Sequence, residues 1–252
     1  MIRAHWGVDS VNAGTTTRLG GTSEGVYASL NLGAHVGDAP ACVSANRKIL
    51  LEQAGLPAAP RWLNQVHGNR VIDSRSPEFA HGPPDADAIV SQDGTDVLAI
   101  LTADCLPIVL CSTQSPGLAA IHCGWRSLVG GIVGATVAAL DARPETLQAW
   151  LGPAISQPAF EVGDDVRDLF LAGIENAATC FTANENDRWQ ADLYGLARLY
   201  LAAAGVEHVH GGEYCTYRDP ARFFSYRRDG QCGRMATFIF RANGVADGGK
   251  LD

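Results

Sequence analysis

Short apolar runs recur along the chain, each bounded by glycine, proline or polar residues. Runs of this length, rich in aliphatic and β-branched residues, are typical of buried strands, because a helix needs a longer periodic pattern. We therefore predict strands at 97–101, 107–111, 118–122, 148–152, 207–211 and 235–240.

Longer segments carry apolar residues at helical spacing, and these predict helices at about 40–54, 126–141, 163–173 and 192–204. The last of them begins at Asp192, which favours an N-cap, and ends before Gly205, which suits the position after a helix. Strands arrive both in adjacent pairs and in alternation with helices. This mixture favours a mixed-sheet α/β or α+β fold over a strictly doubly wound one.

The length of 252 residues is near the upper limit for one hydrophobic core, so we predict a single domain over 1–252. No internal repeat, low-complexity tract or long linker divides the sequence. The segment 75–84 is the best candidate for a loop, and we expect a flexible tail at about 242–252.

Composition and charge narrow the functional classes. Hydrophobic residues make up 46% and charged residues 18%, which is ordinary for a globular protein. The net charge of −8 argues against binding of nucleic acid or of an anionic membrane, both of which need a basic face. The most apolar stretch, 128–140, is shorter than the roughly 20 residues of a membrane span. The first ten residues contain no apolar signal-peptide core, so we expect a soluble cytoplasmic protein.

The seven cysteines form no disulfide framework, because their number is odd and their spacing is irregular. No CxxC pair occurs, which excludes a zinc ribbon and a thioredoxin-like motif. This pattern is consistent with a reducing compartment.

Three segments place metal-binding side chains at the ends of apolar strands: 63–71 contains His67, 99–110 contains Cys105, and 118–127 contains His122. Two imidazoles and one thiolate suit Zn²⁺, and three protein ligands with an open fourth position are typical of a catalytic zinc site. Since neighbouring side chains on a strand point to opposite faces, Cys123 should point away from the site if His122 points into it.

Other interpretations of the same residues remain open. Cys105 could be a nucleophile with His122 as its base, as in a cysteine hydrolase, or each residue could simply be part of the core. Asp104, next to Cys105, could be a general acid or base, could hold a ligand histidine, or could cap a turn. Spacing alone does not separate these roles.

A basic segment at 222–234 gathers arginines and aromatic residues. If it is extended, Tyr226 and Arg228 lie on one face, and Ser225 and Arg227 lie on the other. Aromatic rings between arginines favour stacking on a base or sugar, and the alternative is a solvated basic hairpin. Arg126 lies where a predicted helix begins, and a helix start with an arginine can hold phosphate.

A series of motifs in order resembles one known family. The motifs are GGTSEGVYASLNLGAHVGD (20–38), NQVHG (64–68), DADAIVS (85–91), TADCLP (102–107), HCGWR (122–126), LGPAISQPAFEVG (151–163) and CTYRDPARFFSYRRDGQCGRMATFI (215–239). They resemble the YfiH-type proteins, also called the laccase-domain or multicopper polyphenol oxidase family, and more recently purine nucleoside phosphorylase-like proteins or peptidoglycan editing factors. The resemblance runs from about Gly20 to about Ile239.

This resemblance implies a four-layer α/β/β/α sandwich and a zinc site formed by His67, Cys105 and His122. It also places Arg126 and the pair Arg227 and Arg228 near the substrate. The chain departs from the family's usual HAGWRG in having HCGWRS, which puts Cys123 beside a ligand and places Ser127 where it could narrow the pocket entrance.

The resemblance further implies a zinc-dependent enzyme that cleaves adenosine, inosine or methylthioadenosine with phosphate and deaminates adenosine. In that mechanism Cys105, His122 and Asp104 are the candidate catalytic residues, while Arg126, Tyr226, Arg227 and Arg228 bind substrate and phosphate. The oligomeric state cannot be read from the sequence.

Three alternatives remain. The first is a hydrolase that removes a wrong amino acid from cell-wall precursors, using the same three ligands. The second is copper-dependent phenol oxidation, which is disfavoured because the chain has only seven histidines, although Cu²⁺ could occupy the site in vitro. The third is a non-enzymatic binding module.

Overall fold

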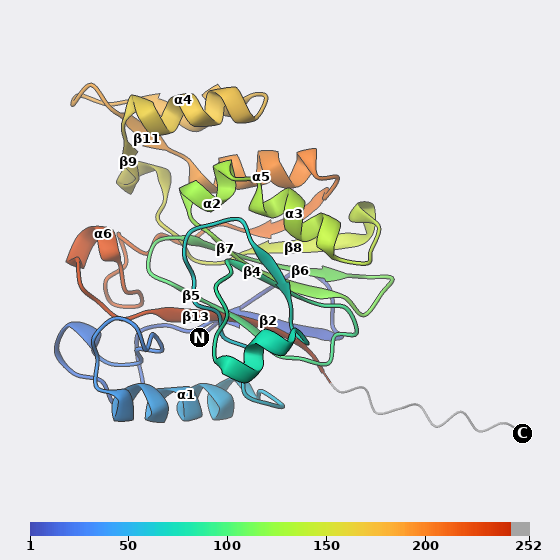
Figure 1. Ribbon diagram of the computed structural model, residues 1–252. Coiled ribbons are helices and arrows are strands. Elements are labelled where there is room, and N and C mark those ends of the chain that lie inside the picture. The colour runs from blue at the N-terminus through green and yellow to red at the C-terminus, as the bar shows by residue number, and fades with distance from the viewer. Residues whose placement is uncertain (243–252) are drawn as a thin grey trace, which may run out of the picture.

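The computed structural model describes residues 1–242 and stacks two β-sheets face to face (Figure 1). The larger sheet has the order β12 (His208–Gly211), β8 (Leu147–Leu151), β6 (Leu106–Ser112), β7 (Leu118–Cys123), β4 (Ala88–Ser91) and β3 (Val71–Asp73). The smaller sheet has the order β1 (Ile2–Arg3), β2 (Val11–Thr15), β13 (Met235–Arg241) and β5 (Leu98–Thr102).

Helices cover both outer faces of this pair of sheets (Figure 1). The larger sheet packs against α2 (Trp125–Val129), α3 (Ile132–Ala139) and α5 (Leu193–Ala203). The smaller sheet packs against α1 (Pro40–Ala54). The predicted α/β/β/α sandwich is therefore confirmed.

The pleat of the central strands builds the interior of the sandwich. In β6, Leu106, Ile108 and Leu110 pack toward the helices, while Val109 and Cys111 pack toward the smaller sheet. Because both faces of β6 are covered, its sequence is apolar from Leu106 to Cys111 and shows no alternation.

Two features of the sheets differ from expectation. Only the larger sheet is mixed, because β12 pairs with β8 and β3 pairs with β4 in parallel while its other pairings are antiparallel. The smaller sheet is wholly antiparallel. A third sheet, formed by β9 (Glu161–Val162), β10 (Phe181–Ala183) and β11 (Trp189–Ala191), lies with α4 (Asp164–Gly173) beyond α2 (Figure 1).

The six predicted strands are present within a residue or so of their expected bounds, but seven others among residues 1–242 were missed. The longest of these is β2, whose five residues include Asn12 and Gly14 and so form no apolar run. β1, β3 and β9 are two or three residues long, which is too short for a hydrophobic pattern to show. The predicted helix at 126–141 is wrong as one element, because the chain breaks at Gly130 and at Gly131, whose φ is +82°. Short helical turns lie at η1 (Gly25–Tyr27), η2 (Pro77–His81), η3 (Pro144–Thr146), η4 (Gln157–Ala159), η5 (Ala177–Cys180) and α6 (Tyr226–Asp229).

The other boundaries follow from local signals. α5 starts after Asp192, as predicted, although the side chain of Asp192 makes no capping hydrogen bond. Of the predicted flexible tail, 243–252 lies outside the described residues, while the N–H of Ala242 donates to Ser10 O at 3.2 Å. Within residues 1–242, no helix has the length and apolar character needed to cross a membrane.

The chain passes from one sheet to the other in the three residues between β5 and β6. Asp104 in this turn has a φ of +89°, a left-handed conformation that aspartate tolerates better than most side chains. The tight crossing brings Cys105 to the end of the sandwich where the candidate site lies.

Candidate active site

The fold brings His67, Cys105 and His122 together from three separate segments. Their ligand atoms all lie within 4.8 Å of one another, and Cys105 Sγ lies 3.7 Å from His67 Nε2. His67 comes from the loop before β3, Cys105 from the turn between the sheets, and His122 from β7. No other group of three such side chains converges within residues 1–242.

A buried carboxylate that the sequence interpretation missed, Asp87, orients both histidines. Asp87 Oδ1 lies 2.7 Å from His122 Nδ1, which leaves Nε2 of that ring to face the centre. The same carboxylate accepts the backbone N–H groups of Val66, His67 and Gly68 at 3.2, 2.9 and 2.7 Å. These bonds hold His67 in its left-handed conformation, with φ +59°.

The charges of this cluster reinforce one another. Burial disfavours the thiolate of Cys105, but His122 and the hydrogen bonds from both histidines lower its pKa to about 6. Burial likewise raises the pKa of Asp87, yet the hydrogen bonds from His122 and the backbone outweigh it and hold that pKa below its ordinary value. The cluster therefore presents an anionic sulfur, which is the form that binds metal.

The backbone of Gly124 packs closely against this centre. A Cβ at this position would lie 3.1 Å from His67 Cδ2 and 3.3 Å from Cys105 Sγ. His122 points between the sheets, while Cys123 is buried on the opposite face, as predicted from the strand pleat. Ser127 is fully buried and lines neither cavity at the site, so the prediction that it narrows the entrance is wrong.

Asp104 does not hold a ligand histidine, since that role belongs to Asp87. Its carboxylate instead accepts the hydroxyls of Thr216 and Ser225 at 2.6 and 3.0 Å and the backbone N–H of Arg227 at 2.7 Å. These partners lie more than one hundred residues away in sequence. Asp104 thereby fastens the turn that carries Cys105 to the segment that carries Tyr226 and Arg227.

Two cavities meet at the ligand cluster and share His67, Cys105 and Tyr226 in their walls. The larger one, of about 410 Å³, also includes Thr102 and Arg234. The Thr102 hydroxyl is buried in this wall without a partner from the protein. The smaller one, of about 240 Å³, includes Arg126 and Arg227.

Three of the four predicted substrate-binding residues reach these cavities. Tyr226 is 60% exposed as a residue and borders both of them. Arg126 stacks on Trp125 with its guanidinium carbon 4.2 Å from the ring centroid, and Arg227 lies over Phe160 at 5.5 Å. Each arginine thus borders the smaller cavity against an aromatic surface.

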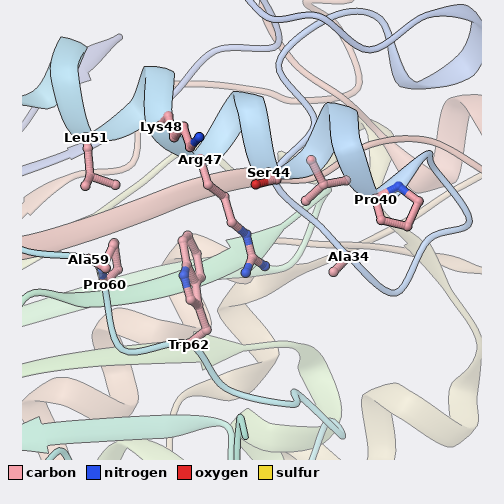
Figure 2. Close-up of a pocket in the computed structure, with 10 residues that line it drawn as sticks. Ala34, Pro40, Ser44, Arg47, Lys48, Leu51, Ala59, Pro60 and Trp62 are labelled. Carbon is pink, nitrogen blue, oxygen red and sulfur yellow. The ribbon is translucent and has the colours of Figure 1, made fainter.

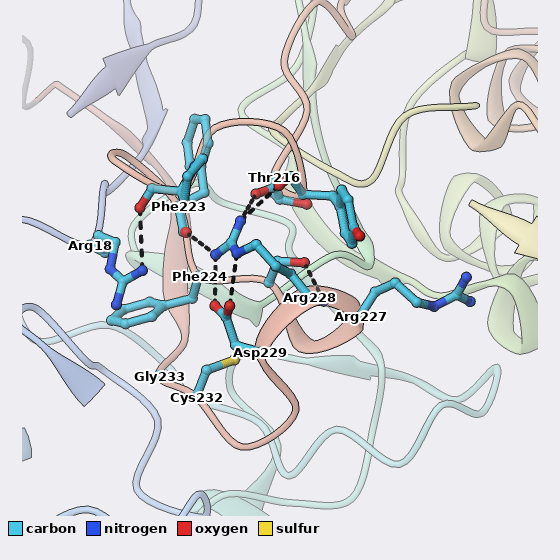
Figure 3. A network of polar contacts seen from close by, with 12 residues as sticks. Arg18, Thr216, Phe223, Phe224, Arg227, Arg228, Asp229, Cys232 and Gly233 are labelled. Atoms are coloured by element: carbon cyan, nitrogen blue, oxygen red, sulfur yellow. Dashed lines mark hydrogen bonds and ion pairs between the residues drawn. The ribbon is translucent and has the colours of Figure 1, made fainter. Parts of the chain in front are cut away.

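Arg228 is not available to a substrate. All five of its N–H groups are used: they donate to the carbonyls of Thr216, Tyr217 and Phe223 and to the carboxylate of Asp229 (Figure 3). Residues 226–229 form a helical turn. The expectation of an extended segment, with Tyr226 and Arg228 on the same face, is therefore wrong. Figure 3 shows Arg227 extending away from this network.

Comparison with known proteins establishes the family. A family model described as "Multi-copper polyphenol oxidoreductase laccase" matches residues 12–242. The chain belongs to this laccase-domain family, which confirms the predicted resemblance. One relative in it is "Purine nucleoside phosphorylase YfiH" of Escherichia coli K12, which is 46% identical over 91% of this chain and 93% of its own length. Another is "Purine nucleoside phosphorylase PA4543" of Pseudomonas aeruginosa, which is 45% identical over 91% of this chain and 93% of its own length.

Solved structures show the same laccase-domain fold. Protein NMB0706 of Neisseria meningitidis is 47% identical, with a TM-score of 0.90 over 95% of this chain and 98% of its own. YlmD of Geobacillus stearothermophilus is 34% identical, with a TM-score of 0.85 over 92% of each chain.

Proposed function

We propose that this protein is a zinc-dependent purine nucleoside enzyme that cleaves adenosine, inosine or methylthioadenosine with phosphate and deaminates adenosine to inosine. The observation that carries the proposal is the cluster of His67, Cys105 and His122 at the junction of two cavities, one of them bordered by two arginines. The names of the E. coli and P. aeruginosa relatives support the nucleoside chemistry.

The donor set fits zinc. One sulfur with a lowered pKa and two imidazoles match the ligand types of catalytic zinc sites, and Asp87 supplies the outer hydrogen bond that such a histidine needs. When bound there, Zn²⁺ supplies a Lewis acid that polarises a ligand group. His67 and Cys105 leave the cluster open toward both cavities.

The larger cavity suits the nucleoside. Tyr226 is exposed and borders this cavity, so its ring can stack on a purine or sugar. Gln65 also lines this cavity, but its amide forms two hydrogen bonds with the backbone of Leu101, at 2.7 and 2.8 Å. Gln65 therefore fixes the shape of the cavity wall.

The smaller cavity suits phosphate. Arg126 and Arg227 place two cations beside the ligand cluster, and the one carboxylate in this wall, that of Asp104, already accepts hydrogen bonds from three protein donors. Held there, phosphate is positioned to attack the sugar carbon as the bond to the base breaks, and the cations stabilise the charge.

One observation argues against polyphenol oxidation by several coppers. Such an oxidase needs further histidine clusters, and among residues 1–242 only the three-residue cluster converges. Copper in this single site is compatible with the donors, so metal content must be measured and not assumed.

The test is metal analysis combined with a nucleoside assay on the untagged protein. We expect about one zinc per chain, phosphate-dependent release of hypoxanthine from inosine, and conversion of adenosine to inosine. Cys105→Ala should lose metal and both activities, whereas Cys42→Ala, on helix α1 away from the site, should keep them. Zinc without turnover of these nucleosides would contradict the proposal and favour the cell-wall precursor, and no metal at all would overturn the metal centre.

A further inference from the structure

The larger cavity at the ligand cluster adjoins a second cavity. It shares His35 and Leu101 with a neighbouring cavity of about 290 Å³. That cavity in turn shares Ala34, Arg47 and Trp62 with a groove of about 520 Å³ along helix α1. The three hollows therefore adjoin one another in a row from the metal centre to α1, and we call this row the cleft.

The walls of this cleft have an unusual charge. The chain carries 27 acidic residues against 19 lysines and arginines, yet among residues 1–242 no aspartate or glutamate lines any of the three hollows. The charged groups that do line them outside the ligand cluster are all cationic: Arg47, Lys48 and Arg234. Such a wall attracts anions.

Two of these cations lie at the far end without a carboxylate partner. Neither Arg47 nor Lys48 forms an ion pair with any acidic group among residues 1–242. Arg47 is partly buried, with its guanidinium carbon 4.4 Å from the Trp62 ring centroid and with Nε and Nη2 on Leu32 O at 3.2 and 3.1 Å. The contacts orient the guanidinium but leave its charge unneutralised.

Figure 2 shows how the far end is built. Arg47 and Leu51 extend from α1 toward Trp62, Ala59 and Pro60 on the other side, and Lys48 lies on the same helix beside Arg47. At the junction, burial together with the positive charges of Arg234 and Arg47 lowers the pKa of His35, so the field of these arginines reaches the middle of the cleft.

We propose that the cleft continues past His35 to a second subsite at Arg47 and Lys48, which binds the phosphate groups of a nucleotide whose nucleoside end lies at the metal centre. This rests on the proposed function, because it takes the nucleoside to occupy the cavity beside His67 and Cys105. Guanidinium and ammonium groups are the side chains that recognise phosphate, and the adjoining hollows extend beyond the cavity that the nucleoside would occupy.

The experiment compares the binding of inosine, inosine 5′-monophosphate and inosine 5′-diphosphate to the holoenzyme by calorimetry. Inosine has no amine, so it cannot be deaminated. In phosphate-free buffer it cannot undergo phosphorolysis either, so binding is measured without turnover. We expect the diphosphate to bind about ten-fold more tightly than inosine at low salt. Lys48→Glu should reduce that ratio about three- to ten-fold, while Arg143→Glu, an equal charge reversal outside the cleft, should leave the ratio unchanged.

Three results would overturn the subsite. In the first, the diphosphate binds no more tightly than inosine. In the second, Arg143→Glu reduces the affinity ratio as much as Lys48→Glu does. In the third, only Arg126→Gln reduces the ratio, which would place the phosphates in the smaller cavity. Failure of the proposed function is a separate result. A Lys48-dependent preference for the diphosphate, without phosphate-dependent release of hypoxanthine, would retain the subsite and reject the phosphorylase.

Discussion

Asp87 shows how one buried carboxylate can organise a site whose ligands are far apart in sequence. It accepts from the ring of His122 and from three consecutive backbone N–H groups around His67. Because it is fully buried, every one of these bonds replaces hydration that the carboxylate has lost.

Asp87→Asn should therefore weaken zinc binding about 10- to 100-fold, because an amide cannot accept from all of these donors. Competition with a chromophoric chelator measures the zinc affinity. Asp85→Asn is the matched control, since Asp85 is exposed and accepts from Asn64 outside the ligand cluster. Equal zinc affinity in Asp87→Asn and the wild type would contradict the assigned role.

Asp104 gives a second prediction at this scale, because positioning and proton transfer have different kinetic signatures. Asparagine and glycine both tolerate its φ of +89°, so Asp104→Asn and Asp104→Gly remove the carboxylate without straining the turn. If Asp104 positions Tyr226 and Arg227, the KM for phosphate should rise several-fold in both variants while kcat and zinc content change little. A fall in kcat of about 100-fold at constant KM would instead support the general acid or base role.

At the scale of elements, the break between α2 and α3 decides where Trp125 and Arg126 lie. A continuous helix over 126–141 would extend α3 along one axis, whereas the turn at Gly130 and Gly131 lets α2 stand at the edge of the smaller cavity. Gly131 is needed for its backbone conformation alone, because a Cβ there would meet nothing within 4 Å.

This assignment predicts opposite effects for two glycines that lie three residues apart. Gly131→Ala should lower the free energy of unfolding by about 1 kcal/mol, because alanine is strained at a positive φ. Gly134→Ala, on the exposed side of α3 with open space around it, should raise that energy by about 0.5–1 kcal/mol. Urea denaturation measures both, and a stabilising Gly131→Ala would show that the break is not a requirement of the native backbone.

At the scale of the whole molecule, the ligand cluster connects parts that the chain keeps separate. His67 precedes β3, Cys105 lies between the two sheets and His122 lies on β7, so a bound metal would tie these parts together in the native state only. Metal binding should then stabilise the fold as a whole.

Removal of the metal with a chelator should accordingly lower the Tm, and added zinc should restore it. Zinc at about 100 times its Kd contributes about 2.7 kcal/mol. In Cys105→Ala the Tm should no longer respond to zinc at these concentrations, while Cys42→Ala should respond like the wild type. A zinc response that survives in Cys105→Ala would place the stabilising metal elsewhere.

The sequence by itself determined six of the strands, most helices, the family and the three ligand candidates, because each depends on local patterns or on motifs a few residues long. Only the tertiary structure decided which polar groups meet. Asp104 contacts Ser225 across 121 positions, and His122 contacts Asp87 across 35. The same holds for Arg228, whose guanidinium is satisfied by carbonyls and a carboxylate, and for Arg227, which lines the smaller cavity and donates one hydrogen bond to the carbonyl of Glu161. Such contacts depend on how two sheets and their loops pack, and neither residue type nor spacing encodes that packing locally.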